Sequence, residues 1–157
     1  MKIKETYKTK EKIMNNSLTE EQVKVLNMSQ SVINEVRKVI IGKDEIIIKV
    51  LLSILAGGHI LIEDIPGVGK TTLAVALSKA LSLDYKRLQF TPDVLPTDVT
   101  GFTILNKETH KFEYKQGAAL TNLFLADEIN RTSSKTQSAL LEVMEEGQVT
   151  VDGETHE

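Results

Sequence analysis

The sequence predicts an α/β fold, in which a parallel sheet lies between layers of helices. Three strands are predicted, at 59–63, 86–90 and 122–126, of which the first is a short apolar run, and helix-forming or hairpin-forming segments separate them. A strand–loop–helix–strand order of this kind favours a parallel sheet covered by helices. Ligands of such sheets bind at the carboxyl ends of the strands, so functional residues are expected in the loops that follow them.

The residues before the first strand predict a tail and two helices. Residues 1–15 are polar and rich in Lys and Glu, and we expect a mobile tail followed by one domain over 16–157. Ser17-Leu18-Thr19-Glu20 matches a capping box, after which apolar residues from Val25 to Val39 recur at helical spacing and predict a core-facing stripe. A second helix is expected from about Asp44 to Ala56, closed by Gly57-Gly58.

A glycine-rich loop follows the first predicted strand. It reads Asp64-Ile65-Pro66-Gly67-Val68-Gly69-Lys70-Thr71-Thr72. Gly67 and Gly69 let the backbone approach phosphate oxygens, and a helix predicted from Thr71 to about Leu81 points free N–H groups at an anion. Lys70 would place a positive charge at the β- and γ-phosphates, and the Thr71 hydroxyl would ligate Mg²⁺. The loop therefore predicts a site for a nucleoside triphosphate with magnesium.

One position departs from the usual phosphate-loop pattern G-x-x-x-x-G-K-[ST]. Asp64 stands where the first glycine is expected, whereas the phosphate-facing part from Gly67 to Thr72 is intact. The alternative is a Gly/Pro turn that is followed by Lys-Thr without any phosphate-binding role.

The third predicted strand ends in two adjacent carboxylates, Asp127 and Glu128. Neighbouring residues of an extended chain point in different directions, so the two can take separate tasks. Asp127 would hold Mg²⁺ directly or through water, and Glu128 would orient or deprotonate the water that attacks the γ-phosphate. The alternative is a strand end with a solvated acidic tip, and the preceding phosphate loop argues against it.

The remaining elements are predicted from local signals. Two prolines make 91–96 a loop, and β-prone pieces at 102–105 and 111–114 flank a polar turn and indicate a hairpin. A helix is expected over 134–146, closed by Gly147, and Asp152-Gly153 after a short β-prone run signals a type I′ turn.

Composition limits the classes of function. The 157 residues are 41% hydrophobic and 26% charged, with a net charge of −3, which gives no electrostatic reason to expect a duplex DNA binder. There is no cysteine, and no apolar run is long enough to span a bilayer. We expect a soluble cytoplasmic protein.

Four further motifs follow the phosphate loop. They are Phe90-Thr91-Pro92-Asp93-Val94-Leu95-Pro96-Thr97-Asp98-Val99-Thr100-Gly101, Leu125-Ala126-Asp127-Glu128-Ile129-Asn130-Arg131, Lys135-Thr136-Gln137-Ser138-Ala139-Leu140-Leu141-Glu142 and Met144-Glu145-Glu146-Gly147-Gln148-Val149. With the phosphate loop, they make the chain from about residue 20 onward resemble the MoxR family of AAA+ ATPases, in which the variant Asp64 is common.

The resemblance implies a Mg²⁺-dependent ATPase that forms a ring, usually a hexamer, and assembles or activates client proteins, often metal-centre enzymes or proteins with von Willebrand factor A domains. It also implies that Ile41 and Gly42 line the adenine pocket, that the hairpin near 102–114 is an insertion in the second helix, and that Gln89 gates the catalytic Glu128. Arg131 would contact a neighbouring subunit or its nucleotide, or else pair as a surface arginine with a nearby carboxylate.

The family's strand order, 5-1-4-3-2, implies that the fourth strand lies between the first and the third. Only three of these strands are predicted here, so we expect a partial core, truncated before strands four and five and the helical lid. Strand 59–63 would then have two unpaired edges, and the chain alone should fold poorly and hydrolyse ATP weakly or not at all. Two other functions stay open: a nucleic-acid motor on the same type of core, and a non-catalytic nucleotide-binding scaffold.

Overall fold

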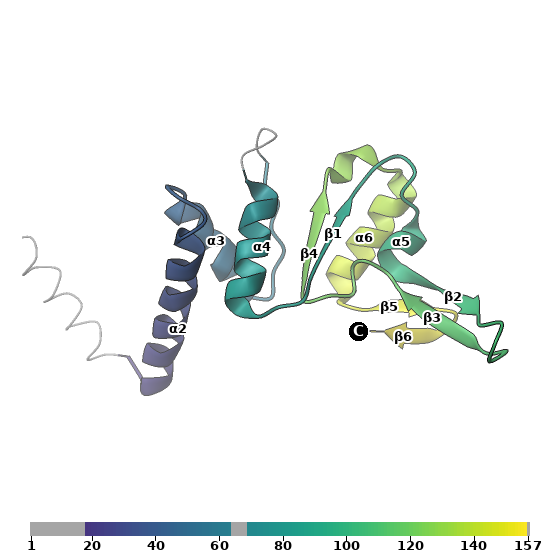
Figure 1. Cartoon of the computed structure of the whole chain (residues 1–157), viewed down its shortest axis with the longest axis horizontal. Helices are drawn as coiled ribbons and strands as arrows, with labels where there is room; N and C mark the ends of the chain where they lie inside the picture. Colours follow the sequence, from purple (N-terminus) through teal and green to yellow (C-terminus); the bar gives the residue numbers. More distant parts are fainter. Residues whose placement is uncertain (1–17, 64–68, 157) are drawn as a thin grey trace, which may run out of the picture. The chain divides into compact units, whose positions relative to one another are not determined.

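The computed structural model describes residues 18–63 and 69–156, and these form two compact units that meet in the sequence at Ile60 and Leu61 (Figure 1). The predicted tail at 1–15 and the loop residues Asp64 to Val68 lie outside the described residues. Each unit is built around its own buried side chains.

The first unit pairs helix α2 (Glu20–Arg37) with helix α3 (Asp44–Leu55). Thr19 caps α2: its hydroxyl accepts a hydrogen bond from the Gln22 amide at 3.3 Å, and the Gln22 side chain accepts one from the Thr19 amide at 2.9 Å. The capping box predicted from Ser17 to Glu20 is therefore wrong by two residues, because Thr19-x-x-Gln22 fits the same pattern and lies next to the first helical residue.

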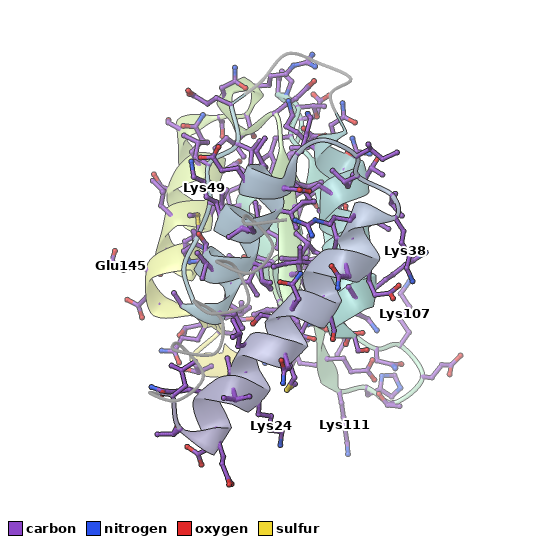
Figure 2. The ribbon with its side chains drawn as sticks, turned by 90° about the vertical axis from the view of Figure 1, so that its left-hand side faces the viewer. Lys24, Lys38, Lys49, Lys107, Lys111 and Glu145 are labelled. Carbon is purple, nitrogen blue, oxygen red and sulfur yellow. The ribbon has the colours of Figure 1, made fainter. Side chains whose placement is uncertain are left out.

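The predicted core stripe of α2 is buried only in part. Of the predicted stripe, Val36 is buried and Val32 half-buried, whereas Val25, Met28 and Val39 are exposed. Ile33, which the predicted spacing omits, is buried as well. The 12 residues of α3 are too few to cover the 18 residues of α2, so only the carboxyl-terminal part of α2 finds an apolar partner there. Figure 2 shows Lys24, Lys38 and Lys49 spread along these two helices with their side chains pointing outward.

The second unit contains a parallel pair of strands, β1 (Tyr85–Gln89) and β4 (Leu123–Asp127). Their register runs from Tyr85 opposite Leu123 to Gln89 opposite Asp127, which confirms the second and third predicted strands to within one residue. The strand predicted at 59–63 is wrong: these residues form no strand in the structure. A strand needs a hydrogen-bonded neighbour, and among the described residues neither β1 nor β4 pairs with this segment.

Helices cover both faces of this strand pair, which confirms a three-layer α/β fold (Figure 1). Helix α4 (Lys70–Leu81) contacts β4 on one side. On the other side, Leu88, Phe124 and Ala126 pack against a core of buried residues from α5 (Pro96–Thr100) and α6 (Ser134–Glu146) and the residue after β1; these are Phe90, Val99 and Leu140.

Helix α6 has the bounds that the sequence predicts, with Ser133 as its N-cap and Gly147 closing it in the left-handed conformation at φ 68°. Helix α5 was not predicted. It begins with a proline at its first position, and the Asp98 carboxylate accepts a hydrogen bond from the Leu95 amide at 2.8 Å. The preceding loop is held by the buried Thr136, whose hydroxyl donates to the Val94 carbonyl at 2.8 Å.

Two hairpins complete the second unit. Strands β2 (Gly101–Leu105) and β3 (Phe112–Gln116) are antiparallel and confirm the predicted hairpin. Strands β5 (Val149–Val151) and β6 (Glu154–His156) are joined by Asp152 and Gly153 at φ 52° and 85°, the two positive values that a type I′ turn requires. A 3-10 turn, η1 (Ile129–Arg131), follows β4.

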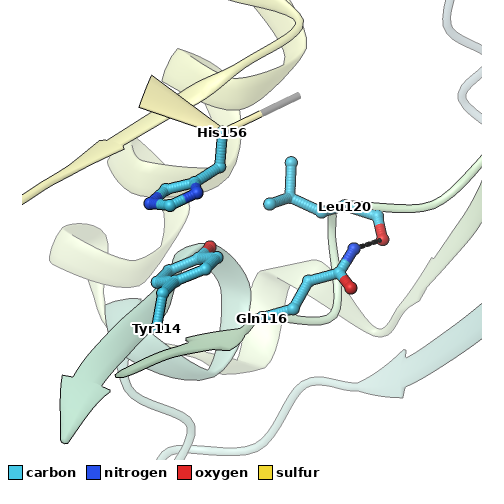
Figure 3. A pocket seen from close by; sticks show the side chains of 4 residues that line it. All are labelled: Tyr114, Gln116, Leu120 and His156. Carbon is cyan, nitrogen blue, oxygen red and sulfur yellow. Dashed lines mark hydrogen bonds between the residues drawn. The ribbon is translucent and has the colours of Figure 1, made fainter. Parts of the chain in front are cut away.

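The β5–β6 hairpin packs beside β3 through a stack of Tyr114 on His156, whose ring centroids are 3.6 Å apart (Figure 3). The Tyr114 hydroxyl donates to the Thr100 carbonyl, and burial raises the pKa of this hydroxyl. The two rings, with Gln116 and Leu120, line a pocket of about 340 Å³. The pocket lies between β3, β6 and the segment after β3 that carries Leu120, and Asp127 is not among its lining residues (Figure 3).

Candidate functional site

The described part of the phosphate loop is the start of α4. Gly69 is the N-cap at φ 89° and ψ 22°, a left-handed conformation that disfavours any residue with a β-carbon. Lys70, Thr71 and Thr72 are the first three helical residues. Amides in the first turn of a helix have no acceptor within that helix, and no side chain among the described residues caps this one. The start of α4 therefore suits an anion.

The acidic pair lies where β4 ends. Asp127 is the last residue of the strand, and its carbonyl accepts a hydrogen bond from the Phe90 amide at 2.8 Å. Helix α4 runs opposite in direction to β4, so its first residues and the carboxyl ends of β1 and β4 lie at the same end of this unit (Figure 1). The fold thus brings the described end of the phosphate loop and the acidic pair to one edge of the sheet.

Each carboxylate of the pair has an arginine partner. Arg87 Nη2 lies 2.8 Å from Asp127 Oδ2, with side chains that are 40% and 21% exposed. Arg131 Nη1 lies 2.6 Å from Glu128 Oε2, with side chains that are 53% and 42% exposed. The hydrogen bond to Asp127 raises the pKa of the Arg87 guanidinium, which stays charged.

The backbone at Glu128 is unusual. Its φ of 57° and ψ of 42° place it in the left-handed region, from which the chain enters the turn η1, and its carbonyl accepts a hydrogen bond from the Arg131 amide at 3.0 Å. Non-glycine residues in this region carry strain, and such residues cluster at functional sites. The turn also carries Arg131 back to the Glu128 side chain, so this arginine does pair with a nearby carboxylate.

The roles predicted for Gln89, Ile41 and Gly42 stay predictions. Gln89, predicted to gate Glu128, lies opposite Asp127 in the register, and its Oε1 is 3.4 Å from Arg87 Nη2. No hydrogen bond joins Gln89 to Glu128 among the described residues, and the gating role stays a prediction. Ile41 and Gly42 belong to the first unit, between α2 and α3, where the Ile41 side chain is 86% exposed; their predicted adenine contact is untested.

Sequence reasoning missed Arg87 as a site residue. The signal was present, because Arg87 and Gln89 are two residues apart on a strand and therefore share a face. Only the pairing register of β1 with β4 shows that this face also carries Asp127.

The oxygen donors at this edge fit a magnesium nucleotide. Thr71 and Asp127 offer a hydroxyl and a carboxylate, the hard oxygen ligands that Mg²⁺ prefers. Within residues 18–63 and 69–156, no group of three or more His, Asp or Glu side chains could hold a metal ion. Mg²⁺ bound with a nucleotide needs only one or two protein ligands, since phosphate and water oxygens complete its shell.

The layered fold and the paired strand ends define the class of a P-loop NTPase. The family model described as "ATPase family associated with various cellular activities (AAA)" matches residues 59–157. Chaperone MoxR1 of Mycobacterium tuberculosis is 41% identical over 121 residues, which cover 77% of this chain and 32% of that protein. The chain belongs to the MoxR family of AAA+ ATPases.

Two further comparisons agree with this family. The uncharacterised protein YeaC of Bacillus subtilis is 58% identical over 123 residues, covering 78% of this chain and 38% of that protein. The crystal structure of a candidate ATPase from Cytophaga hutchinsonii superposes with a TM-score of 0.74 at 47% identity, covering 83% of this chain and 39% of that one. The chain thus spans between 32% and 39% of the length of these relatives. Among the helices of the described residues, none is both long and apolar enough to cross a membrane.

Proposed function

We propose that this protein binds ATP with Mg²⁺ and hydrolyses it, and that the energy drives remodelling of client proteins in the manner of a chaperone. The observation that carries the proposal is that α4 begins at the same end of this unit as that at which β4 ends (Figure 1). The proposed roles of Gly67 to Thr72 follow from the phosphate-loop sequence.

The proposed chemistry divides the work among a few side chains. Lys70 and the first amides of α4 would hold the phosphates, and Thr71 and Asp127 would hold Mg²⁺, which supplies charge neutralisation when bound. Glu128 would orient a water and accept its proton as the water oxygen attacks the γ-phosphorus and the bond to ADP breaks. The bond from Arg131 occupies Glu128 Oε2, so the other carboxylate oxygen is the one available to water.

The proposed assembly is a homo-oligomeric ring, in which an arginine from a neighbouring subunit completes each site. Such an arginine contributes about 10³–10⁵ in rate in related phosphoryl-transfer systems, so turnover per chain should rise steeply with protein concentration. The relative MoxR1 is named a chaperone, and we propose client proteins here as well, with von Willebrand factor A domain proteins as the first candidates.

Replacement of Glu128 by Gln tests the enzymatic part. Glu128→Gln should lower ATP turnover by about 10²–10⁴-fold while leaving ATP affinity close to that of the wild type, because only the proton acceptor is lost. The matched control is Glu142→Gln, on the exposed face of α6, which should turn over ATP at the wild-type rate. Equal turnover in all three proteins would contradict the role of Glu128, and wild-type binding without turnover would favour a scaffold.

A nucleic-acid motor is the alternative that the same assay separates. The net charge of −3 gives no electrostatic reason to expect a duplex DNA binder. Stimulation of ATP hydrolysis by DNA, with a steep dependence on salt, would replace the client-protein proposal.

A further inference from the structure

One face of the β1–β4 pair carries the polar residues of the site. Leu88, Phe124 and Ala126 pack into the α5–α6 core. Because successive strand residues alternate between faces, Arg87 and Asp127 lie on the opposite face. Asp127 is therefore not fixed by the apolar core, and its side chain needs another partner to hold one orientation.

Arg87 is that partner, and it touches only one of the two carboxylate oxygens. Its Nη2 is 2.8 Å from Asp127 Oδ2, and the same nitrogen is 3.4 Å from Gln89 Oε1. Within the part of the chain that the structure describes, Asp127 Oδ1 has no protein partner. The guanidinium thus ties one oxygen to the neighbouring strand and leaves the second oxygen open.

We propose that Arg87 is a positioning residue, which holds Asp127 Oδ2 so that Oδ1 remains available as the metal ligand. This inference rests on the proposed function, since it assumes that a magnesium nucleotide binds at this edge. Carboxylates that ligate metals are commonly held by such outer hydrogen bonds, and loss of the outer partner weakens metal binding by about 10–100-fold.

The competing explanation is that Arg87 is a counter-ion which Mg²⁺ must displace. A guanidinium that neutralises a carboxylate frequently binds both of its oxygens, as Arg37 does with Asp44, whereas Arg87 binds one. Its side chain is also 40% exposed, so water and salt screen its repulsion of a nearby cation. The one-oxygen contact and this exposure favour positioning.

The two explanations predict opposite changes in an Arg87→Met variant. The measurement is the affinity of the purified protein for a fluorescent ADP analogue during a Mg²⁺ titration, and again in EDTA. The Mg²⁺ concentration that gives half of the Mg²⁺-dependent increase in affinity for the ADP analogue is compared between the two proteins. If Arg87 positions Asp127, this concentration should be about 10–100-fold higher for Arg87→Met than for the wild type. Its affinity in EDTA should equal that of the wild type, which also shows that the variant is folded. Arg87→Lys should lie between the two, because one ammonium restores the contact without the planar guanidinium geometry.

Lys115→Met is the matched control, since it removes an exposed cation of the β2–β3 hairpin that lies 3.7 Å from Glu113. It should bind Mg²⁺ and the ADP analogue as the wild type does. An Arg87→Met variant with equal or tighter Mg²⁺ dependence than the wild type overturns the positioning role and leaves the proposed function standing. If the wild type binds no nucleotide, or if its affinity for the ADP analogue does not depend on Mg²⁺, both the positioning role of Arg87 and the proposed function are overturned.

Discussion

The left-handed backbone of Glu128 leads to a prediction about stability that is independent of any ligand. At φ 57° and ψ 42°, a residue with a β-carbon is strained, whereas glycine adopts this conformation freely. Glu128→Gly should therefore be more stable than Glu128→Ala. Neither variant keeps the ion pair with Arg131, so its loss cancels in the comparison.

The size of the effect follows from two opposing terms. The left-handed conformation destabilises a residue with a β-carbon by roughly 1–2 kcal/mol relative to glycine. The greater conformational freedom of glycine in the unfolded chain opposes this and destabilises the glycine variant by about 0.5–1 kcal/mol. The free energy of unfolding of Glu128→Gly should thus exceed that of Glu128→Ala by about 0.5–1 kcal/mol. Glu142 is exposed and lies within α6, so Glu142→Gly should be less stable than Glu142→Ala by about 1 kcal/mol.

The assay is denaturant unfolding of the four variants, Gly and Ala at each of the two positions. The difference between glycine and alanine should change sign between 128 and 142, with a total spread of about 1.5–2 kcal/mol. Midpoints should move at constant slope, and a difference of about 1 kcal/mol should appear as about 2–4 °C in a thermal melt. An alanine variant at 128 as stable as the glycine variant would refute strain at this position.

Two further predictions concern the hairpin region. Gly117→Ala should destabilise the second unit by about 1–3 kcal/mol or more in thermal unfolding, because a β-carbon there would lie 2.2 Å from the Val99 carbonyl oxygen. Gly58→Ala meets only an oxygen at 3.6 Å and should change stability by no more than about 0.5 kcal/mol; equal melts for the two variants would contradict the close approach at Gly117. Burial raises the pKa of Tyr114 above its ordinary value of 10.0, so the neutral hydroxyl stabilises the fold below that pH and the stability falls as the pH rises further. Tyr114→Phe should show a smaller loss of melting temperature in this alkaline range, and a loss as steep as in the wild type would count against the buried hydroxyl.

The sequence predicted those elements whose signals are local. Both ends of helix α6 are defined by residues next to it in the sequence, the N-cap Ser133 and the closing Gly147, and its bounds are as predicted. The turn at Asp152-Gly153 needs two positive φ angles that few residue pairs tolerate, and it too is confirmed. For the same reason Asp127 and Glu128 could be placed at a strand end, since an apolar run ends there.

Elements that depend on distant partners were harder to predict. The run at 59–63 has the composition of a buried strand, but composition cannot supply the neighbour that a strand requires. Helix α5 has only five residues, too few for a hydrophobic period, and its first residue is Pro96, the last residue of the predicted loop. The capping box of α2 was ambiguous because two overlapping segments match one pattern, and the structure selects Thr19 with Gln22.

The two arginine contacts of the acidic pair differ in the same way, because one depends on a distant residue and the other is local. Arg87 reaches Asp127 across two strands, 40 residues apart in sequence, so no local motif could reveal it. Arg131 reaches Glu128 within one turn, and the sequence had offered that contact as one of two alternatives.

The exposure of these pairs decides what they can do. Water and salt screen ion pairs between side chains of this exposure, so neither arginine holds its carboxylate strongly enough to block a stronger ligand. Each contact nevertheless favours one orientation of a side chain that would otherwise rotate freely. Two weak pairs at the carboxyl ends of the strands therefore favour one orientation of each carboxylate, and among the described residues Asp127 Oδ1 keeps no protein partner.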